Sequence, residues 1–196
     1  VSCYQLTIHP RTGFGVRAAR GELTELPEDA QAGLFEVTHR VLADAGWPAY
    51  EVSNFARGPE HESRHNRKYW DHTPYLGLGP SAHSLAITDG GALPSARRWW
   101  NELRTPRWES RLAAGERPVE ASESLAPKAL ATEAVMLGLR TTAGIDLDRF
   151  TARYGFDLLA ANDALVARLV AEGHLVVREG PEGGQLLVPT ASGLAV

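Results

Sequence analysis

The sequence predicts an α/β fold in which a β-α-β unit, from a parallel barrel or an open sheet, precedes a small winged-helix-like α+β domain. Three observations lead to this fold. Residues 2–9 alternate between two unlike faces, as a strand does. Residues 27–45 repeat apolar side chains at helical spacing, and residues 50–53 provide a second strand. The end of the chain has three helical segments and then a hairpin, which is the order of a winged helix.

Local signals set the limits of the first predicted unit. Pro10 ends the first strand because proline has no N–H to donate to a sheet, and the glycine-containing residues 11–26 are expected to form a loop. Pro27 suits the first turn of the helix, and Gly46 suits its C-terminal cap. We expect the apolar side of this helix to face the sheet, and it consists of Leu34, Val37, Val41, Leu42 and Ala45.

The middle of the chain is expected to add strands to the sheet. Residues 75–84 read as a buried strand that is entered through a glycine turn. Residues 84–99 read as a hairpin around the turn-forming residues 89–91. Three tryptophans follow, and we expect them to cover the edge of the sheet: Trp99, Trp100 and Trp108.

A polar, acidic and weakly patterned segment at residues 115–126 is predicted to be a linker. It divides the chain into a barrel portion at residues 1–114 and a winged-helix-like domain at residues 127–196. The elements expected around and beyond the linker are helices at 126–139, 146–154 and 158–172 and strands at 174–177 and 185–188, joined by a turn at 180–184.

The composition is that of an ordinary globular protein, with 43% hydrophobic and 22% charged residues among 196. Cys3 is the only cysteine, so the chain cannot form an internal disulfide or supply an iron–sulfur site alone. Both facts about cysteine fit a reducing cytoplasm. No apolar run has the length of a membrane span, and no signal peptide is found. Because residues 2–9 already read as a strand, we expect a longer protein with a part upstream of Val1.

Charge argues against a nucleic-acid partner. Lys and Arg number 20 against 24 Asp and Glu, giving a net charge of −4. The candidate recognition helix at 158–172 offers Arg168 against Asp163 and Glu172, and the hairpin carries Glu179 and Glu182. Contacts with phosphates need lysine and arginine on the docking face. We therefore expect no nucleic acid to bind.

Residues 50–84 are the candidate functional stretch. They combine histidines, aromatic rings, cations and a glycine turn, and they have little periodic apolar pattern. In parallel α/β sheets, ligand sites gather at the C-terminal ends of strands. This stretch follows the predicted strand at 50–53, so its position as well as its composition indicates a site.

Two overlapping motifs lie in this stretch. His61, Glu62 and His65 match H-E-x-x-H, the zinc-protease signature, but Gly58 and Pro59 stand just ahead and no helical pattern surrounds the match, so coincidence is the better explanation.

The second motif begins at His65. Its imidazole is a suitable axial ligand for haem iron, Tyr69 and Trp70 are flat enough to cover a macrocycle, and nearby cations could pair with propionates. These cations are Arg64, Arg67 and Lys68. A histidine that caps a loop beside a core tryptophan is the structural alternative, which composition alone favours.

The glycine turn at residues 77–83 allows close approach of the backbone to a ligand such as a nucleoside. Ala82 occupies the third position of a G-x-G-x-x-G/A spacing, but no helix follows, so a dinucleotide fold is not indicated. A tight turn without a ligand is the commoner meaning of this pattern.

Five blocks along the chain, SCYQLTIHPRTGFG, YEVSNFAR, ESRHNRKYW, YLGLGPSAHS and EAVMLGLRTTAGIDL, carry a family resemblance. In this order they resemble the C-terminal half of HemW-type proteins, radical-SAM relatives of oxygen-independent coproporphyrinogen III oxidase. The resemblance implies the C-terminal part of a partial (β/α) radical-SAM barrel and a cytoplasmic haem chaperone that passes haem to acceptor proteins. It also implies that the HNxxYW haem motif falls on His65 as the iron ligand, Asn66, Tyr69 and Trp70.

The resemblance further implies an S-adenosyl-L-methionine (SAM) pocket lined by Thr7, Gly79, Ala82 and His83. The chain departs from the family in lacking the CxxxCxxC motif that holds the 4Fe-4S cluster and the early glycine-rich SAM segment. We therefore expect SAM and the cluster to belong to the full-length protein and no radical chemistry from this chain alone. The alternative function is coproporphyrinogen III oxidase, which decarboxylates propionates with SAM and a 4Fe-4S cluster, and whether the full-length protein is an enzyme stays open.

Overall fold

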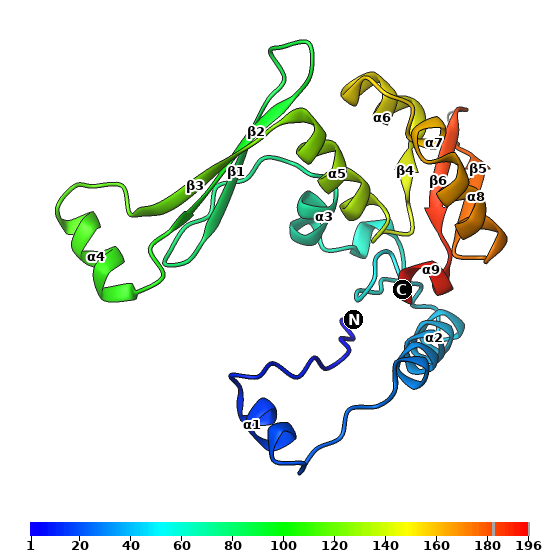
Figure 1. Cartoon of the computed structure of the whole chain (residues 1–196), viewed down its shortest axis with the longest axis horizontal. Coiled ribbons are helices and arrows are strands. Elements are labelled where there is room, and N and C mark those ends of the chain that lie inside the picture. Colours follow the sequence, from blue (N-terminus) through cyan, green and yellow to red (C-terminus); the bar gives the residue numbers. More distant parts are fainter. Residues whose placement is uncertain (182, 196) are drawn as a thin grey trace.

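The computed structural model describes residues 1–181 and 183–195 and has a mixed α/β fold (Figure 1). Among these residues are two sheets, each of three antiparallel strands, in the orders β1-β2-β3 and β4-β6-β5. Helix α5 lies between the two sheets (Figure 1). The strands are β1 (His83–Thr88), β2 (Ser95–Asn101), β3 (Val119–Leu125), β4 (Ile145–Asp146), β5 (Leu175–Glu179) and β6 (Gln185–Pro189). The helices are α1 (Gly13–Ala19), α2 (Glu28–Asp44), the 3-10 helix η1 (Pro59–His61), α3 (Arg64–Trp70), α4 (Thr105–Ala113), α5 (Pro127–Gly138), α6 (Leu147–Tyr154), α7 (Leu158–Ala161), α8 (Asp163–Ala171) and α9 (Ala191–Ala195).

The core lies where α5 packs against both sheets. Leu130 on α5 has 0% exposure, Leu85 on β1 has 3%, and Leu187 on β6 has 2%. They belong to one apolar cluster that also includes Phe150 of α6. Because α5 contacts β2, β3 and α6, it is the element that joins the first sheet to the C-terminal elements.

The predicted strand at residues 2–9 is wrong for this structure. The segment is extended but pairs only at its start, where Ser2 bridges Asn54 and the Cys3 N–H donates to the Ser53 carbonyl at 2.9 Å. Tyr4 is 72% exposed and Leu6 is 65% exposed. A strand needs a neighbouring strand along its length to bond its backbone groups, and no described strand pairs with this segment beyond the bridge at Ser2. Residues 1–26 therefore extend away from the body, as the dark blue trace in Figure 1 shows.

The loop predicted at 11–26 contains α1, whose N-cap Thr12 accepts a hydrogen bond from the Gly15 N–H. The next helix was predicted at 27–45 and is observed as α2, with Pro27 and Ala45 as its caps. Its apolar side does not face a sheet, contrary to expectation: Leu34 is 56% exposed and Val41 57%, whereas His39 is buried. The reason is that the flanking strands of the predicted β-α-β unit are not formed, and residues 50–53 make only isolated bridges.

The predicted hairpin at 84–99 is confirmed as β1 and β2, with His83 opposite Trp100 and Thr88 opposite Ser95. The strand predicted at 75–84 is wrong, because only Tyr75 bridges Leu85 before β1 begins. Consecutive residues of a strand point to opposite faces, so Trp99 and Trp100 do not share one face of the sheet.

The linker predicted at 115–126 contains a strand. Residues 119–125 form β3, which pairs with β2 and places Glu123 opposite Arg98. The strand was missed because it exposes both faces over most of its length, and only Leu125 is buried. Whether the domain boundaries at 114 and 127 are correct stays a prediction.

The elements predicted beyond residue 126 are largely confirmed. Helices α5 and α6 and strands β5 and β6 lie within one or a few residues of their expected bounds. The helix expected at 158–172 is divided into α7 and α8 at Asn162, whose backbone leaves the helical region. Strand β4 and helix α9 were not predicted. Position 182 of the expected turn lies outside the described residues. No helix in the described ranges combines the length and the apolar character needed to cross a membrane.

Candidate functional site

The haem motif predicted from the resemblance lies on a short helix, α3, where the sequence had indicated a loop. The side chain of Ser63 caps the helix by accepting a hydrogen bond from the Asn66 N–H at 3.2 Å. At its other end, the Thr73 N–H donates to the Lys68 carbonyl at 2.9 Å, and His72 takes a positive φ of 53°. This is the geometry of a Schellman cap, with histidine where glycine is usual.

The helix places the four motif residues on one side. Because successive residues are separated by about 100° around an α-helix, His65, Tyr69, Asn66 and Trp70 fall in this order within a sector of about 140°. Arg64, Arg67 and Lys68, by the same geometry, fall on the remaining side. Spacing alone therefore separates the aromatic motif face of α3 from the cations nearest to it in sequence.

Three residues of the motif face open into a cavity of about 340 Å³, at the small end of the range for ligand sites. Asn66, Tyr69 and Trp70 form one wall. The other lining residues are Tyr4, Glu51, Val52, Ser53, Asn54 and Arg140. We call this space the α3 cavity.

His65 lies beside the α3 cavity rather than among its lining residues. Its imidazole is exposed and packs edge-on against Tyr69, with 5.0 Å between ring centroids. Tyr69 in turn packs edge-on against Tyr75 at 4.8 Å. Neither ring nitrogen of His65 has a hydrogen-bond partner in the described part of the chain. The imidazole is therefore accessible to an external ligand.

Glu51 is the acidic residue that lines the cavity, and it is 1% exposed. Its carboxylate accepts hydrogen bonds from the Ser53 N–H at 3.2 Å and from the Asn54 side-chain amide. The segment is held against the turn after α5, where the Val52 N–H donates to the Arg140 carbonyl at 3.0 Å. A buried carboxylate needs such donors to replace water. Glu51 therefore stabilises the segment at residues 51–54 as well as lining the cavity.

Arg140 provides the positive charge of the α3 cavity. Its guanidinium lies 5.7 Å from the centroid of the Trp70 ring, within the range of a cation–π contact. In the described part of the chain the guanidinium has no carboxylate partner. The indole Nε1 of Trp70 is buried and finds no acceptor among the described residues.

The cations predicted as propionate partners do not line the α3 cavity. Arg67 forms an ion pair with Glu62 at 2.6 Å and a longer one with Asp71 at 3.9 Å. Arg64 and Lys68 are exposed. The ion pair with Glu62 leaves Arg67 the least available of the three.

His72 anchors the end of α3 to α5. It is 7% exposed, and its Nε2 lies 3.4 Å from Oε2 of Glu133, which also pairs with Arg98. Burial lowers the pKa of His72 below its usual value, the charges of Arg153 and Arg98 act in the same direction, and Glu133 opposes them. Burial therefore favours the neutral form of His72 at the point where α3 packs on α5.

The zinc motif is not assembled as a helical face. His61 ends η1, Glu62 and Ser63 have extended backbones, and His65 belongs to α3. The Glu62 carboxylate is paired with Arg67. Nowhere in residues 1–181 and 183–195 do three potential metal ligands of the His, Cys, Asp and Glu types gather.

The predicted SAM-lining residues fall in two places. Gly79 has a φ of 108° and, with Ala82 and His83, forms the turn into β1, where the His83 ring stacks on Trp100 at 5.6 Å. Gly79 also lines a groove of about 660 Å³ that contains Trp99 and Trp108. Thr7 is exposed in the N-terminal segment and is not a lining residue of that groove. The structure does not bring Thr7 to the glycine turn.

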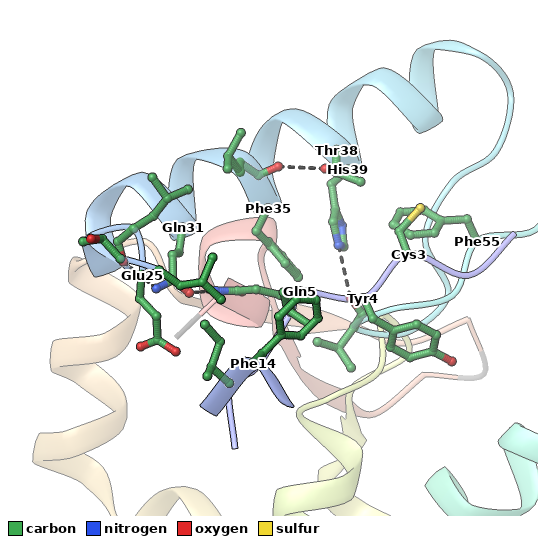
Figure 2. Close-up of a pocket in the computed structure, with 17 residues that line it drawn as sticks. Cys3, Tyr4, Gln5, Phe14, Glu25, Gln31, Phe35, Thr38, His39 and Phe55 are labelled. Atoms are coloured by element: carbon green, nitrogen blue, oxygen red, sulfur yellow. Dashed lines mark hydrogen bonds between the residues drawn. The ribbon is translucent and has the colours of Figure 1, made fainter. Parts of the chain in front are cut away.

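A further cavity of about 470 Å³ lies between the N-terminal segment and α2, and Figure 2 shows its lining. Phe14 and Phe35 reach into it, and His39 bonds the Val52 carbonyl through Nε2 at 3.3 Å. Its walls are largely apolar, and it shares Tyr4 and Val52 with the α3 cavity. The two cavities are therefore neighbours along one side of the turn at residues 50–56.

Sequence reasoning missed three residues around α3: Glu51, His72 and Arg140. The partners of His72 and Arg140, Glu133 and Trp70, lie far away in the sequence, so no local motif marks these two residues. The carboxylate of Glu51 bonds the nearby Ser53 and Asn54, but its burial cannot be read from the sequence. Arg140 follows a predicted helix, and His72 is close to the motif, but only the packing of α3 on α5 brings these elements together.

Comparisons with known proteins identify a matching family model and several relatives. A family model described as the HemN C-terminal domain matches residues 125–193. The chain is 37% identical over 153 residues to the heme chaperone HemW of Mycobacterium tuberculosis, covering 78% of this chain and 37% of that protein. It is 32% identical over 145 residues to the mitochondrial radical S-adenosyl methionine domain-containing protein 1 of Mus musculus, covering 74% of this chain and 33% of that protein.

A solved structure of coproporphyrinogen III oxidase (HemN) from Escherichia coli, described as a radical SAM enzyme, has a similar fold. The TM-score is 0.60 at 19% identity, and the match covers 91% of this chain and 42% of that chain. At this level of identity the likeness speaks for the fold alone. The chain spans well under half of the length of these relatives.

Proposed function

Because this chain belongs to the family of HemW and HemN, we propose that it is the haem-contacting portion of a haem chaperone that binds haem and passes it to acceptor proteins. The single observation that carries this proposal is the motif face of α3. It places an accessible imidazole, two aromatic rings and an amide in one sector of a helix beside a cavity. The name of the M. tuberculosis relative, heme chaperone, supports the same ligand.

In this proposal His65 is the axial ligand of the haem iron, and Tyr69 and Trp70 pack against the macrocycle. The residues present fit such a ligand. Both ring nitrogens of His65 lack partners in the described residues, and Tyr69 is 39% exposed, so both can contact a flat apolar molecule without breaking existing interactions. Asn66 at the cavity wall can donate or accept a hydrogen bond at the edge of the macrocycle.

We also propose that residues 1–114 complete a partial (β/α) barrel in a longer cytoplasmic protein, and that residues 127–196 form a winged-helix-like domain. SAM, with Thr7, Gly79, Ala82 and His83 among its lining residues, and a 4Fe-4S cluster would belong to that longer protein. The cluster does not fit this chain, because Cys3 is its only cysteine and three cysteine ligands cannot be supplied. No step of haem binding as proposed here depends on the cluster or on SAM.

Titration of the purified chain with hemin tests the proposal. We expect the wild-type chain to give a saturable shift of the Soret band and the His65→Ala variant to bind more weakly with an altered spectrum. His174→Ala is the matched control, because His174 immediately precedes β5, its Nδ1 contacts Ser192, and it does not line the α3 cavity. Identical Soret shifts and affinities for wild type and His65→Ala would show that His65 is not the ligand.

The alternative is a coproporphyrinogen III oxidase, which the sequence resemblance leaves open and which the match of residues 125–193 to the HemN C-terminal domain does not exclude. Assaying a longer version of the protein, with its cluster and SAM, for conversion of coproporphyrinogen separates the two functions. The chaperone proposal predicts haem binding and transfer without turnover of coproporphyrinogen.

A further inference from the structure

We propose that Arg140 is the residue that binds a haem carboxylate in the α3 cavity, a role that the local sequence had suggested for Arg64, Arg67 or Lys68. This inference rests on the proposed haem site and names the contact that orients the macrocycle in it. Haem carries two propionates on one edge, so a cation on the side where that edge lies would strengthen binding and orient the macrocycle.

Position on the helix decides which cations can serve. His65 and Trp70 mark the two limits of the motif face, and the three cations of α3 fall outside that sector. Arg64, Arg67 and Lys68 are therefore not among the residues that line the α3 cavity. Arg140 instead approaches from the turn after α5, and its guanidinium lies 5.7 Å from the centroid of the Trp70 ring.

Availability points to the same residue. Arg67 would have to leave Glu62, to which it is paired at 2.6 Å, before it could bind a carboxylate. Arg140 has no acidic partner within the described residues, and the nearby Glu51 carboxylate is already bonded to Ser53 and Asn54. Planar guanidinium groups bind carboxylates through two parallel hydrogen bonds and stack on indoles at the same time.

Two probes with the same iron and macrocycle test the inference: hemin, and hemin dimethyl ester, in which both carboxylates are esterified and carry no charge. We expect Arg140→Gln to weaken hemin binding by about fivefold at low salt. The loss is expected to be no larger because the guanidinium is exposed and its charge is screened by solvent. The variant should bind the ester with the affinity of the wild type. Hemin affinity of the wild type should fall with added salt more steeply than that of the variant. Arg64→Gln and the distant, exposed Arg168→Gln are matched controls that should bind both probes as the wild type does.

Each other outcome has a distinct meaning. If Arg140→Gln binds hemin as tightly as the wild type, or loses affinity for both probes equally, the carboxylate contact of Arg140 is refuted while the haem site stands. A selective loss in Arg64→Gln would move the contact to α3 and also refute it. If the wild-type chain binds neither probe, the proposed function fails and the inference falls with it.

Discussion

Removal of the cap of α3 is the perturbation that most directly links local structure to the proposed site. Ser63 accepts a hydrogen bond from the Asn66 N–H at 3.2 Å, and its carbonyl accepts one from the Arg67 N–H at 2.9 Å. Ser63→Ala removes the first bond and keeps the second. Loss of a serine N-cap costs about 1 kcal/mol of helix stability.

A helix as short as α3 has little stability of its own, so its formation depends on its caps and on its contacts with α5. If haem binding requires α3 to be helical, about 1 kcal/mol lowers hemin affinity by no more than about fivefold. It lowers the unfolding temperature of a chain of this size by about 2–4 °C. Circular dichroism melts and Soret titrations measure the two effects on the same sample.

Two variants make this result interpretable. Ser63→Asp keeps an N-cap acceptor and should retain both the melting temperature and the hemin affinity. Ser110→Ala changes a serine within α4, where alanine favours the helix, and should have no cost. If Ser63→Ala melts and binds like the wild type, or if Ser63→Asp loses as much as Ser63→Ala, the capping argument is wrong.

Two further predictions concern stability. Leu130→Ala should lower the free energy of unfolding by about 2–5 kcal/mol in urea titrations, because Leu130 is fully buried, whereas Leu165→Ala on the exposed side of α8 should cost little; equal costs would contradict the assigned core. The lowered pKa of His72 means that the unfolded chain takes up protons more readily than the folded one, so stability should fall as the pH drops below about 6.5 toward the folded pKa. His72→Asn should reduce this loss of stability at acid pH, because asparagine tolerates the positive φ and does not titrate. His39, whose pKa is also lowered by burial, should account for part of the loss that remains. An unchanged pH dependence in His72→Asn would refute the assignment to His72.

The elements predicted best from the sequence are those whose first and last residues are determined by neighbouring residues in the chain. Helix α2 begins after Pro27 and ends before Gly46, close to the expected bounds. Helix α6 begins at the N-cap Asp146, whose carboxylate accepts from the Arg149 N–H, and it ends at Gly155 with a φ of 76°. In these cases proline, aspartate and glycine determine the ends of the helix whatever the rest of the chain does.

Elements that depend on distant partners were predicted poorly. The alternation at residues 2–9 is typical of a strand, but it does not show whether a neighbouring strand is present to pair with this segment. Strand β3 has the opposite character: its sequence is polar, yet its pairing with β2 and the contact between Glu123 and Arg98 hold it in the sheet. Pairing with a neighbouring strand determined whether residues 2–9 and residues 119–125 form strands, and the sequence of one segment does not show which partner it will have.

For the site, the sequence identified the residue types but not their arrangement. The family motif singled out His65, Asn66, Tyr69 and Trp70, and their roles stay predictions. The helix that aligns them was missed because α3 has no apolar repeat, although Ser63 before it is a recognisable cap signal. The cation over Trp70 belongs to the turn after α5, so Arg140 became visible only once the helices were packed.

The central claim is that an imidazole at position 65 of α3 ligates haem iron, and chemical rescue tests it most directly. In His65→Gly the ligand is removed and a space is left on the motif face, which free imidazole can enter. We predict that His65→Gly binds hemin weakly. Imidazole at millimolar concentration should restore the wild-type Soret spectrum, measured on the hemin that co-elutes with the protein in gel filtration. A wild-type spectrum for His65→Gly without imidazole would contradict the claim, as would a failure of imidazole to restore it.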